Sequence, residues 1–70
     1  MKNLYYFTFT EGSSFYGCIQ PVWANNEEQA TRLIKKEFDS RNICSMYNEQ
    51  QGRTLRENRG LVLLDEMGVK

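Results

Sequence analysis

The sequence predicts a small α+β domain with the element order β-β-α-β-β, in which one helix packs on one face of an antiparallel sheet. Three observations lead to this fold class. Aromatic residues and threonines dominate residues 3–10, apolar residues recur at helical spacing over 27–38, and short apolar runs occupy 43–47 and 61–64. Seventy residues are enough for a single domain, 1–70.

The first strand is expected over residues 3–10, because aromatic and β-branched side chains favour the extended backbone. Side chains alternate between the two faces of a strand, so Tyr5, Phe7 and Phe9 share one face. This is the more apolar face, and we expect it to point into the core. Tyr6 then lies on the opposite face of the sheet, which is expected to be uncovered.

The second strand is expected over 15–24, joined to the first by a turn over 11–14 that is rich in glycine and serine. Pro21 lacks a backbone donor, so this strand is predicted to lie at a sheet edge or to bend at the proline. Gly17 weakens the strand or marks a bulge.

One amphipathic helix is expected from residue 27 to about residue 38. Asn25 and Asn26 offer side-chain acceptors for the first amides, and the two glutamates that follow suit the positive end of the helix dipole. The apolar stripe consists of Ala30, Leu33, Ile34 and Phe38. Because only one such helix is visible, it is predicted to cover only one face of the sheet.

The second half of the chain is expected to contain two more strands, over 43–47 and 61–64, the latter extended by Met67 and Val69. The segment between them, 48–60, is polar and has a single aliphatic residue. We expect this segment to be a long hairpin loop or a mobile flap.

Composition excludes several classes of function. Nine basic and nine acidic residues give a net charge of zero, which disfavours binding to nucleic acid through bulk charge. There is no histidine, so the most frequent general base and most zinc sites are missing, and no metal is expected. No apolar stretch approaches the roughly 18 residues that cross a bilayer, so no membrane association is expected.

The two cysteines, Cys18 and Cys44, are far apart, and a strand-like segment follows Met1 without a secretory leader. We therefore expect reduced, buried thiols and a cytoplasmic location, although a single bridge between the two cysteines is an alternative. No catalytic residue and no cofactor are predicted, because neither a nucleophile elbow nor a glycine-rich phosphate loop is present. The chain is not expected to be an enzyme.

Two groups of side chains are candidates for a partner-binding surface. Aromatic residues on the uncovered sheet face would be exposed, and arginines three residues apart could form a rim that binds carboxylates or phosphates. The candidate residues are Tyr6, Tyr16, Trp23, Arg53, Arg56 and Arg59. The alternative interpretation is that the rings form the core and that the arginines belong to a solvated loop, offset by Glu49 and Glu57.

The segment 22–30, Val-Trp-Ala-Asn-Asn-Glu-Glu-Gln-Ala, carries a strand into a capped helix after an opening Tyr-Phe-Thr-Phe-Thr strand. Over about residues 4–38, this arrangement resembles small phage and prophage accessory proteins of Gram-positive bacteria. The resemblance implies a protein made by a mobile element that binds and modulates a host or defence protein. It transfers no catalytic residues to this chain.

Two functions are therefore predicted. The first is a non-enzymatic protein-interaction module, with anti-CRISPR-like inhibition as its sharpest form, which binds a host protein or pairs with itself as a homodimer. The alternative is binding of single-stranded nucleic acid, in which sheet aromatics stack on bases and Arg41 joins the other arginines on the phosphates. The zero net charge disfavours this alternative.

Overall fold

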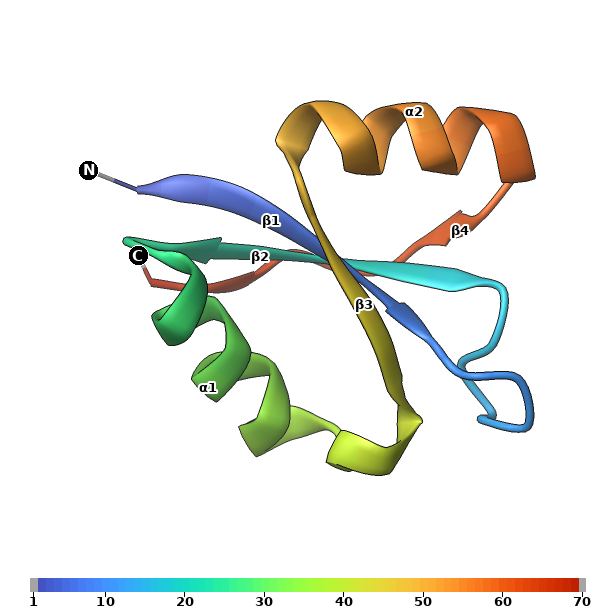
Figure 1. Ribbon diagram of the computed structural model, residues 1–70, viewed down its shortest axis with the longest axis horizontal. Helices are drawn as coiled ribbons and strands as arrows, with labels where there is room; N and C mark the ends of the chain where they lie inside the picture. Colours follow the sequence, from blue (N-terminus) through green and yellow to red (C-terminus); the bar gives the residue numbers. More distant parts are fainter. Residues whose placement is uncertain (1, 70) are drawn as a thin grey trace.

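A mixed five-stranded β-sheet with an α-helix on each face forms the structure, a computed structural model that describes residues 2–69 (Figure 1). The elements, in chain order, are β1 (Asn3–Phe9), β2 (Cys18–Ala24), α1 (Glu27–Glu37), the 3-10 helix η1 (Ser40–Asn42), β3 (Ile43–Asn48), α2 (Glu49–Arg59), β4 (Val62–Leu63) and β5 (Met67–Gly68). The α+β class is confirmed, but the expectation of a single helix is wrong.

The expectation of a fully antiparallel sheet is also wrong. β1 lies between β3 and β2 and is antiparallel to both. The short strands β4 and β5 both pair with the other edge of β2, and both run parallel to it. The predicted fourth strand is thus two separate two-residue strands.

The path of the chain explains why the helices lie on opposite faces. From β2 the chain passes through α1 to β3, and from β3 it returns through α2 to β4. β2, β3 and β4 all point the same way, so both connections are crossovers between parallel strands, which nearly always share one handedness. The first crossover moves from β2 to β3 at one edge of the sheet, and the second moves back from β3 to β4 at the other side. Because the two crossovers have the same handedness, they place α1 and α2 on opposite faces of the sheet, as Figure 1 shows.

The core beneath α1 confirms the predicted helical stripe. Asn26 caps the helix by accepting a hydrogen bond from the Gln29 backbone amide at 2.8 Å. Ala30 and Ile34 are fully buried against Phe7 and its neighbours on the sheet. Each large apolar side chain removed from water in this way contributes about 1.5–3 kcal/mol.

The opposite face of the sheet, predicted to be open, is covered by α2. Leu4, Tyr6 and Ile19 form a second buried cluster there, with Trp23 and Tyr47 packed partly buried against it. Tyr6 is only 7% exposed, so its expected exposure is wrong. The rings on this face belong largely to a second core.

α2 replaces the predicted loop over 48–60, and its ends carry recognisable signals. The Asn48 side chain accepts from the Gln51 amide at 2.8 Å, while the Gln51 side chain accepts from the Asn48 amide at 3.3 Å, which is a capping box. Gly60 closes the helix in the left-handed conformation, with φ 62°. The helix has almost no apolar stripe because it packs through its backbone at Gly52 rather than through large side chains.

Pro21 accounts for the division of the C-terminal pairing into two strands. The outward-facing carbonyls of Ile19 and Trp23 accept hydrogen bonds from the C-terminal segment at 3.0 and 2.8 Å. Pro21 lies midway between them and has no amide to donate, so the ladder is interrupted there. The buried Gln20 side chain fills the gap, and its Nε2 donates to the backbone oxygens of Asp65 at 2.6 Å and of Pro21 at 2.9 Å. β2 is consequently not an outer strand, contrary to one of the two expectations for Pro21.

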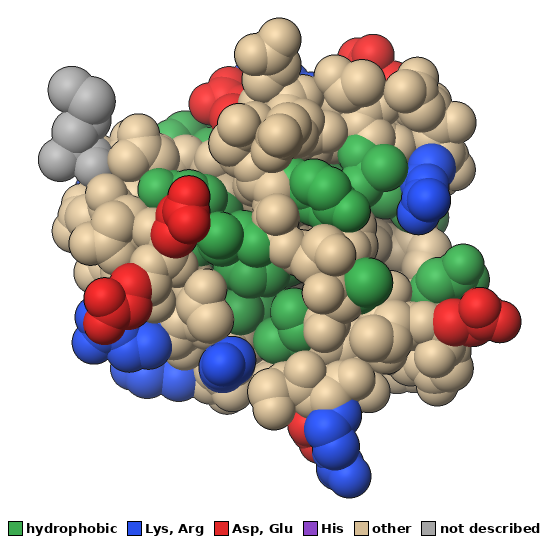
Figure 2. All heavy atoms as spheres, in the orientation of Figure 1, with side chains coloured by type: hydrophobic (Ala, Val, Ile, Leu, Met, Phe, Trp, Pro, Cys, Tyr) green, Lys and Arg blue, Asp and Glu red, His purple; other side chains and the backbone are tan. Residues whose placement is uncertain are grey.

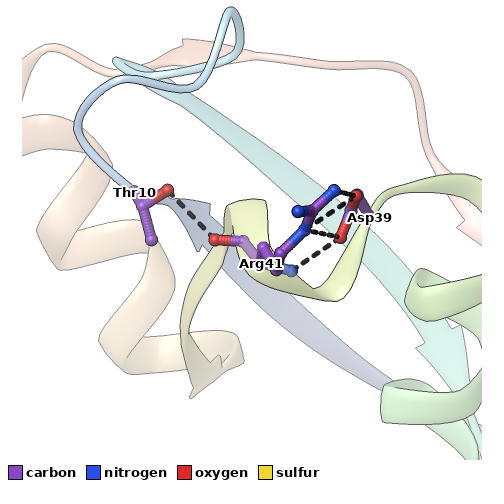
Figure 3. A network of polar contacts seen from close by, with 3 residues as sticks. All are labelled: Thr10, Asp39 and Arg41. Atoms are coloured by element: carbon purple, nitrogen blue, oxygen red, sulfur yellow. Dashed lines mark hydrogen bonds and ion pairs between the residues drawn. The ribbon is translucent and has the colours of Figure 1, made fainter.

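A network of polar contacts fixes the chain immediately before β3 (Figure 3). The Asp39 carboxylate accepts hydrogen bonds from the Arg41 backbone amide at 2.9 Å and from its guanidinium at 2.7 Å. Thr10 donates its hydroxyl to the Arg41 carbonyl at 3.4 Å and its amide to the Asn42 carbonyl at 2.8 Å. These bonds hold the start of β3 beside the end of β1.

The cysteines differ from the expectation that both are buried. Cys44 is exposed and Cys18 is partly buried, and both are free thiols. Cys44 lies where β3 carries an extra residue relative to β1, between the pairs Phe7–Met46 and Phe9–Ile43. Across residues 2–69, neither helix combines the length and hydropathy that crossing a membrane requires.

Candidate functional site

The large hydrophobic side chains that are exposed gather at one end of the molecule. In the described part of the chain, these residues are Phe15, Tyr16, Val62 and Leu63. The first two lie in the loop between β1 and β2, and the other two form β4. The Val62 amide donates to the Gly17 carbonyl at 2.9 Å, which brings β4 against the loop. We call these four residues the hairpin-end patch.

The loop between β1 and β2 is an ordered series of turns. The amides of Ser13 and Tyr16 donate to the carbonyls of Thr10 and Ser13, each at 3.1 Å. The Phe15 amide also donates to the Ser13 hydroxyl at 3.1 Å. Of the two rings in this loop, Phe15 joins a ring cluster and Tyr16 is exposed.

Phe15 is anchored by two other rings. Its centroid lies 5.4 Å from that of Phe9 and 5.0 Å from that of Phe38, in tilted and edge-to-face arrangements. Phe9 and Phe38 are themselves 5.0 Å apart, so the three rings form a closed cluster at the end of α1. Phe15 thus presents one side to solvent from a fixed position, and Tyr16, at 60% exposure, projects beside it.

Two arginines, Arg56 and Arg59, lie in the last turn of α2, shortly before the chain enters β4. The left-handed turn at Gly60 lets the Leu61 amide donate to the Arg56 carbonyl at 3.2 Å, which directs the chain at once into β4. Neither Arg56 nor Arg59 forms an ion pair within residues 2–69, whereas Arg53 pairs with Glu49 at 2.8 Å. Figure 1 shows the loop, β4 and the C-terminal end of α2 at the same end of the fold.

A groove of about 690 Å³ runs from this end across the face of the sheet, beside the C-terminal end of α2. Leu61 contributes apolar lining, while Tyr16, Tyr47 and Arg59 contribute hydrogen-bond donors. Glu11 is the one carboxylate among the lining residues. The groove therefore offers contact area and hydrogen-bond donors.

The structure brings only part of the sequence-predicted partner site together. Tyr16 and Arg59 line the same groove, and Arg56 lies one helical turn before Arg59. Tyr6 is buried beneath α2, and Trp23 is partly buried in the same core. The three tyrosine and tryptophan candidates therefore do not form one exposed face.

Phe15, Val62 and Leu63 are functional candidates that the sequence interpretation placed in strands or the core. No periodicity in the sequence marks them as exposed. The signal that would have helped is the break after α2, because Gly60 permits an abrupt turn and leaves 61–64 too short for a buried central strand.

The described residues hold no cluster of three or more histidine, cysteine, aspartate or glutamate side chains placed to bind a metal ion. No family model matches the chain, and no similar curated protein or solved structure was found.

Proposed function

We propose that the chain is a non-enzymatic protein-interaction module that binds a partner protein through the hairpin-end patch. The observation that carries the proposal is the concentration of the exposed large hydrophobic side chains at one end of the molecule. Exposed apolar patches on small proteins mark contact surfaces, because burying them on binding removes apolar area from water. Scattered exposed residues would carry no such meaning.

The chemistry of the patch defines the partner. Phe15 offers a ring whose position is already fixed by Phe9 and Phe38, so little side-chain entropy is lost when it is covered. Tyr16 adds a second, more exposed ring. Val62 and Leu63 add aliphatic area at the adjacent strand. Arg59, which lines the same groove as Tyr16, favours an acidic side chain at the margin of the partner's surface. The partner is therefore an apolar protein surface bordered by a carboxylate.

The resemblance to phage and prophage accessory proteins supports a more specific form of this proposal. In that form the partner is a host or defence protein, met in the cytoplasm, whose activity the chain modulates. Anti-CRISPR-like inhibition is the sharpest version. The evolutionary origin of the chain and the identity of the modulated host or defence protein stay predictions.

Site-specific photo-crosslinking tests the proposal. A photoreactive phenylalanine analogue is placed at Tyr16 or Val62, and in a matched control at Arg32, which is exposed on α1. In extracts of cells that naturally express the chain, we expect positions 16 and 62 to capture the same protein and position 32 not to capture it. The purified partner should then bind Val62→Asp at least about tenfold more weakly than the unmodified chain.

Three outcomes contradict the proposal. Equal capture from the control position would show non-specific contact, and capture of a second copy alone would make the patch a self-association surface. Binding to a single-stranded oligonucleotide that falls steeply with salt, and not to a protein, would favour the nucleic-acid alternative.

A further inference from the structure

β3 is the outermost strand of the sheet and has one open edge. Within residues 2–69 it pairs with β1 alone, and β1 separates it from the rest of the sheet. Open edges are usually protected by charges, proline or shortness, because their free amides and carbonyls accept another strand. The six residues Ile43–Asn48 contain neither a charge nor a proline, and a bulge at one end leaves the remainder regular.

The helix above this edge has two chemically different sides. With about 3.6 residues per turn, the charged residues of α2 fall mainly on one side of its axis. The other side borders a groove of about 380 Å³ that contains no charged residue. The lining residues are Tyr47, Gln50, Gln51, Thr54, Leu55 and Asn58. Because Tyr47 belongs to β3, this uncharged side of α2 faces the open edge.

Figure 2 views the molecule from this edge, since β3 crosses in front of β1 and β2 in the same orientation in Figure 1. Hydrophobic side chains lie across the middle of the face, and the charged groups lie mostly toward its margins. A core depleted in charge with a charged rim is the composition of a protein interface.

We propose that a second copy of this chain docks at the open edge of β3, in an antiparallel β3–β3 pairing that joins the two sheets into one. The two-fold axis of such a pairing is perpendicular to the sheet, so both α2 helices lie on the same face. Each presents its uncharged side to the other across the seam. Thr54 and Leu55, near the middle of that side, lie close to the axis, and the amide side chains lie opposite one another.

The distribution of charge supports a second copy rather than a foreign strand. Self-pairing of an uncharged strand creates no like-charge contact along the seam. In an antiparallel pairing, the start of β3 in one copy lies beside the end of β3 in the other. The start of β3 is close to Arg41 in the chain, and its end is followed by Glu49. Opposite charges therefore meet at both ends of the seam, although each already has a partner in its own chain. The two helix dipoles are opposed as well, which is favourable.

The dimer leaves the β4 part of the hairpin-end patch, Val62 and Leu63, free. β4 borders β2 at the other side of the sheet, away from β3. Two copies joined through β3 therefore present two patches that face outward, and binding to a partner with two sites gains from effective concentration. The pairing is inferred independently of the proposed function, because it uses different residues.

Measurement of mass in solution tests the pairing. We expect about twice the 8.3 kDa of one chain, with dissociation on dilution. Thr54→Glu and Thr54→Lys each place like charges across the axis, and each should weaken the dimer at least about tenfold. An equimolar mixture of these two variants should restore dimers, because the unlike charges then face one another. This rescue separates a broken interface from a misfolded chain.

Lys36→Gln on α1 is the matched control, because it changes the net charge by the same amount as Thr54→Glu, away from β3. It should leave the dissociation constant unchanged. A single-chain mass at every concentration overturns the proposal. A dimer that is insensitive to both Thr54 variants, or a mixture that fails to recover, overturns it as well, because the contact then lies elsewhere.

Discussion

The backbone of α2 at Gly52 rests directly on the ring of Tyr6. A Cβ atom at position 52 would lie 2.7 Å from the Tyr6 Cβ and closer still to atoms of its ring. Gly52 is the one buried residue of α2, and Tyr6 is buried beneath it. The helix therefore covers its face of the sheet by close approach of the backbone, without a stripe of large side chains.

Gly52→Ala should consequently destabilise the fold, although alanine in a helix normally gains roughly 1 kcal/mol over glycine. Overpacking against the ring should cost about 1–3 kcal/mol in the free energy of unfolding, measured by urea denaturation. Glu57→Ala, exposed on the same helix and away from the proposed dimer seam, controls for helix propensity and should be neutral or slightly stabilising.

The Tyr6→Leu background tests the cause of that cost. With the ring removed, Gly52→Ala should lose at least about 0.5 kcal/mol of its penalty, because the two positions are in contact. A Gly52→Ala variant that is more stable than the unmodified chain would show that the helix does not sit on Tyr6.

Gln20→Met should release the C-terminal segment. The substitution removes both bonds from Gln20 Nε2, to the Asp65 and Pro21 carbonyls, while keeping a similar volume in the core. We expect a loss of about 1–3 kcal/mol in stability, because a buried polar group loses its partner. Amide hydrogen exchange at Leu64 and Val69 should accelerate more than exchange in β1.

Asn3→Ala is the control for this measurement, because it removes one exposed hydrogen bond, from Asn3 Nδ2 to the Asn25 carbonyl at 3.3 Å. Its effect should be small. Uniform acceleration of exchange in every strand of the Gln20→Met variant would mean that Gln20 supports the whole core rather than the C-terminal segment.

The Asp39–Arg41 contact predicts a dependence on pH. Hydrogen bonds from the Arg41 guanidinium and backbone amide lower the pKa of Asp39 from 3.8 to about 2. Because the pKa in the folded state is the lower one, the stabilisation is present above pH 3.8 and is lost as the pH falls through about 2. An NMR titration of the Asp39 carboxyl carbon should report this pKa directly.

Arg41→Gln should return the pKa of Asp39 toward 3.8, because it removes the guanidinium and keeps the backbone amide. Asp39→Asn should abolish the corresponding slope of stability between pH 4 and pH 2. A pKa of Asp39 that is unchanged in Arg41→Gln would contradict the contact drawn in Figure 3.

The two thiols should react at different rates. Cys44 is exposed at the bulge of β3, whereas Cys18 is partly buried in β2. We expect a thiol reagent to label Cys44 in the native protein well before Cys18, measured with Cys18→Ser and Cys44→Ser variants at low protein concentration. Equally slow labelling of both thiols before unfolding would instead support the burial that the sequence suggested.

The same experiment bears on the proposed pairing. Cys44 lies in the strand that forms the seam, so its labelling should slow as protein concentration rises through the dissociation constant, while that of Cys18 should not. A rate for Cys44 that is independent of concentration, in a sample whose mass shows dimers, would place the contact away from β3.

Local patterns were sufficient for the first half of the chain. The alternation of rings in β1 and the cap and stripe of α1 are short-range signals, because they depend on backbone propensity and on residues three or four apart. The turn between β1 and β2 is likewise encoded by its own glycines and serines. These elements could therefore be predicted from the sequence alone.

The second helix could have been found only from its ends. Asn48, Gln51 and Gly60 form a capping box and a left-handed C-cap, but the residues between them lack the apolar periodicity that marks an amphipathic helix. A central glycine argues against a helix when it is judged by propensity. Gly52 is needed because it lets the helix backbone approach Tyr6 closely, and this contact forms only when the two segments meet in the folded chain.

The sequence by itself determined the α+β class, the hairpin, the first helix and the supply of large apolar side chains. Tertiary structure decided which of them remain at the surface. Tyr6 became core because a second crossover returned across the other face, while Phe15, Val62 and Leu63 stayed exposed where the chain turns at the end of the sheet. Exposure depends on contacts between segments far apart in the chain, and no local pattern specifies those contacts.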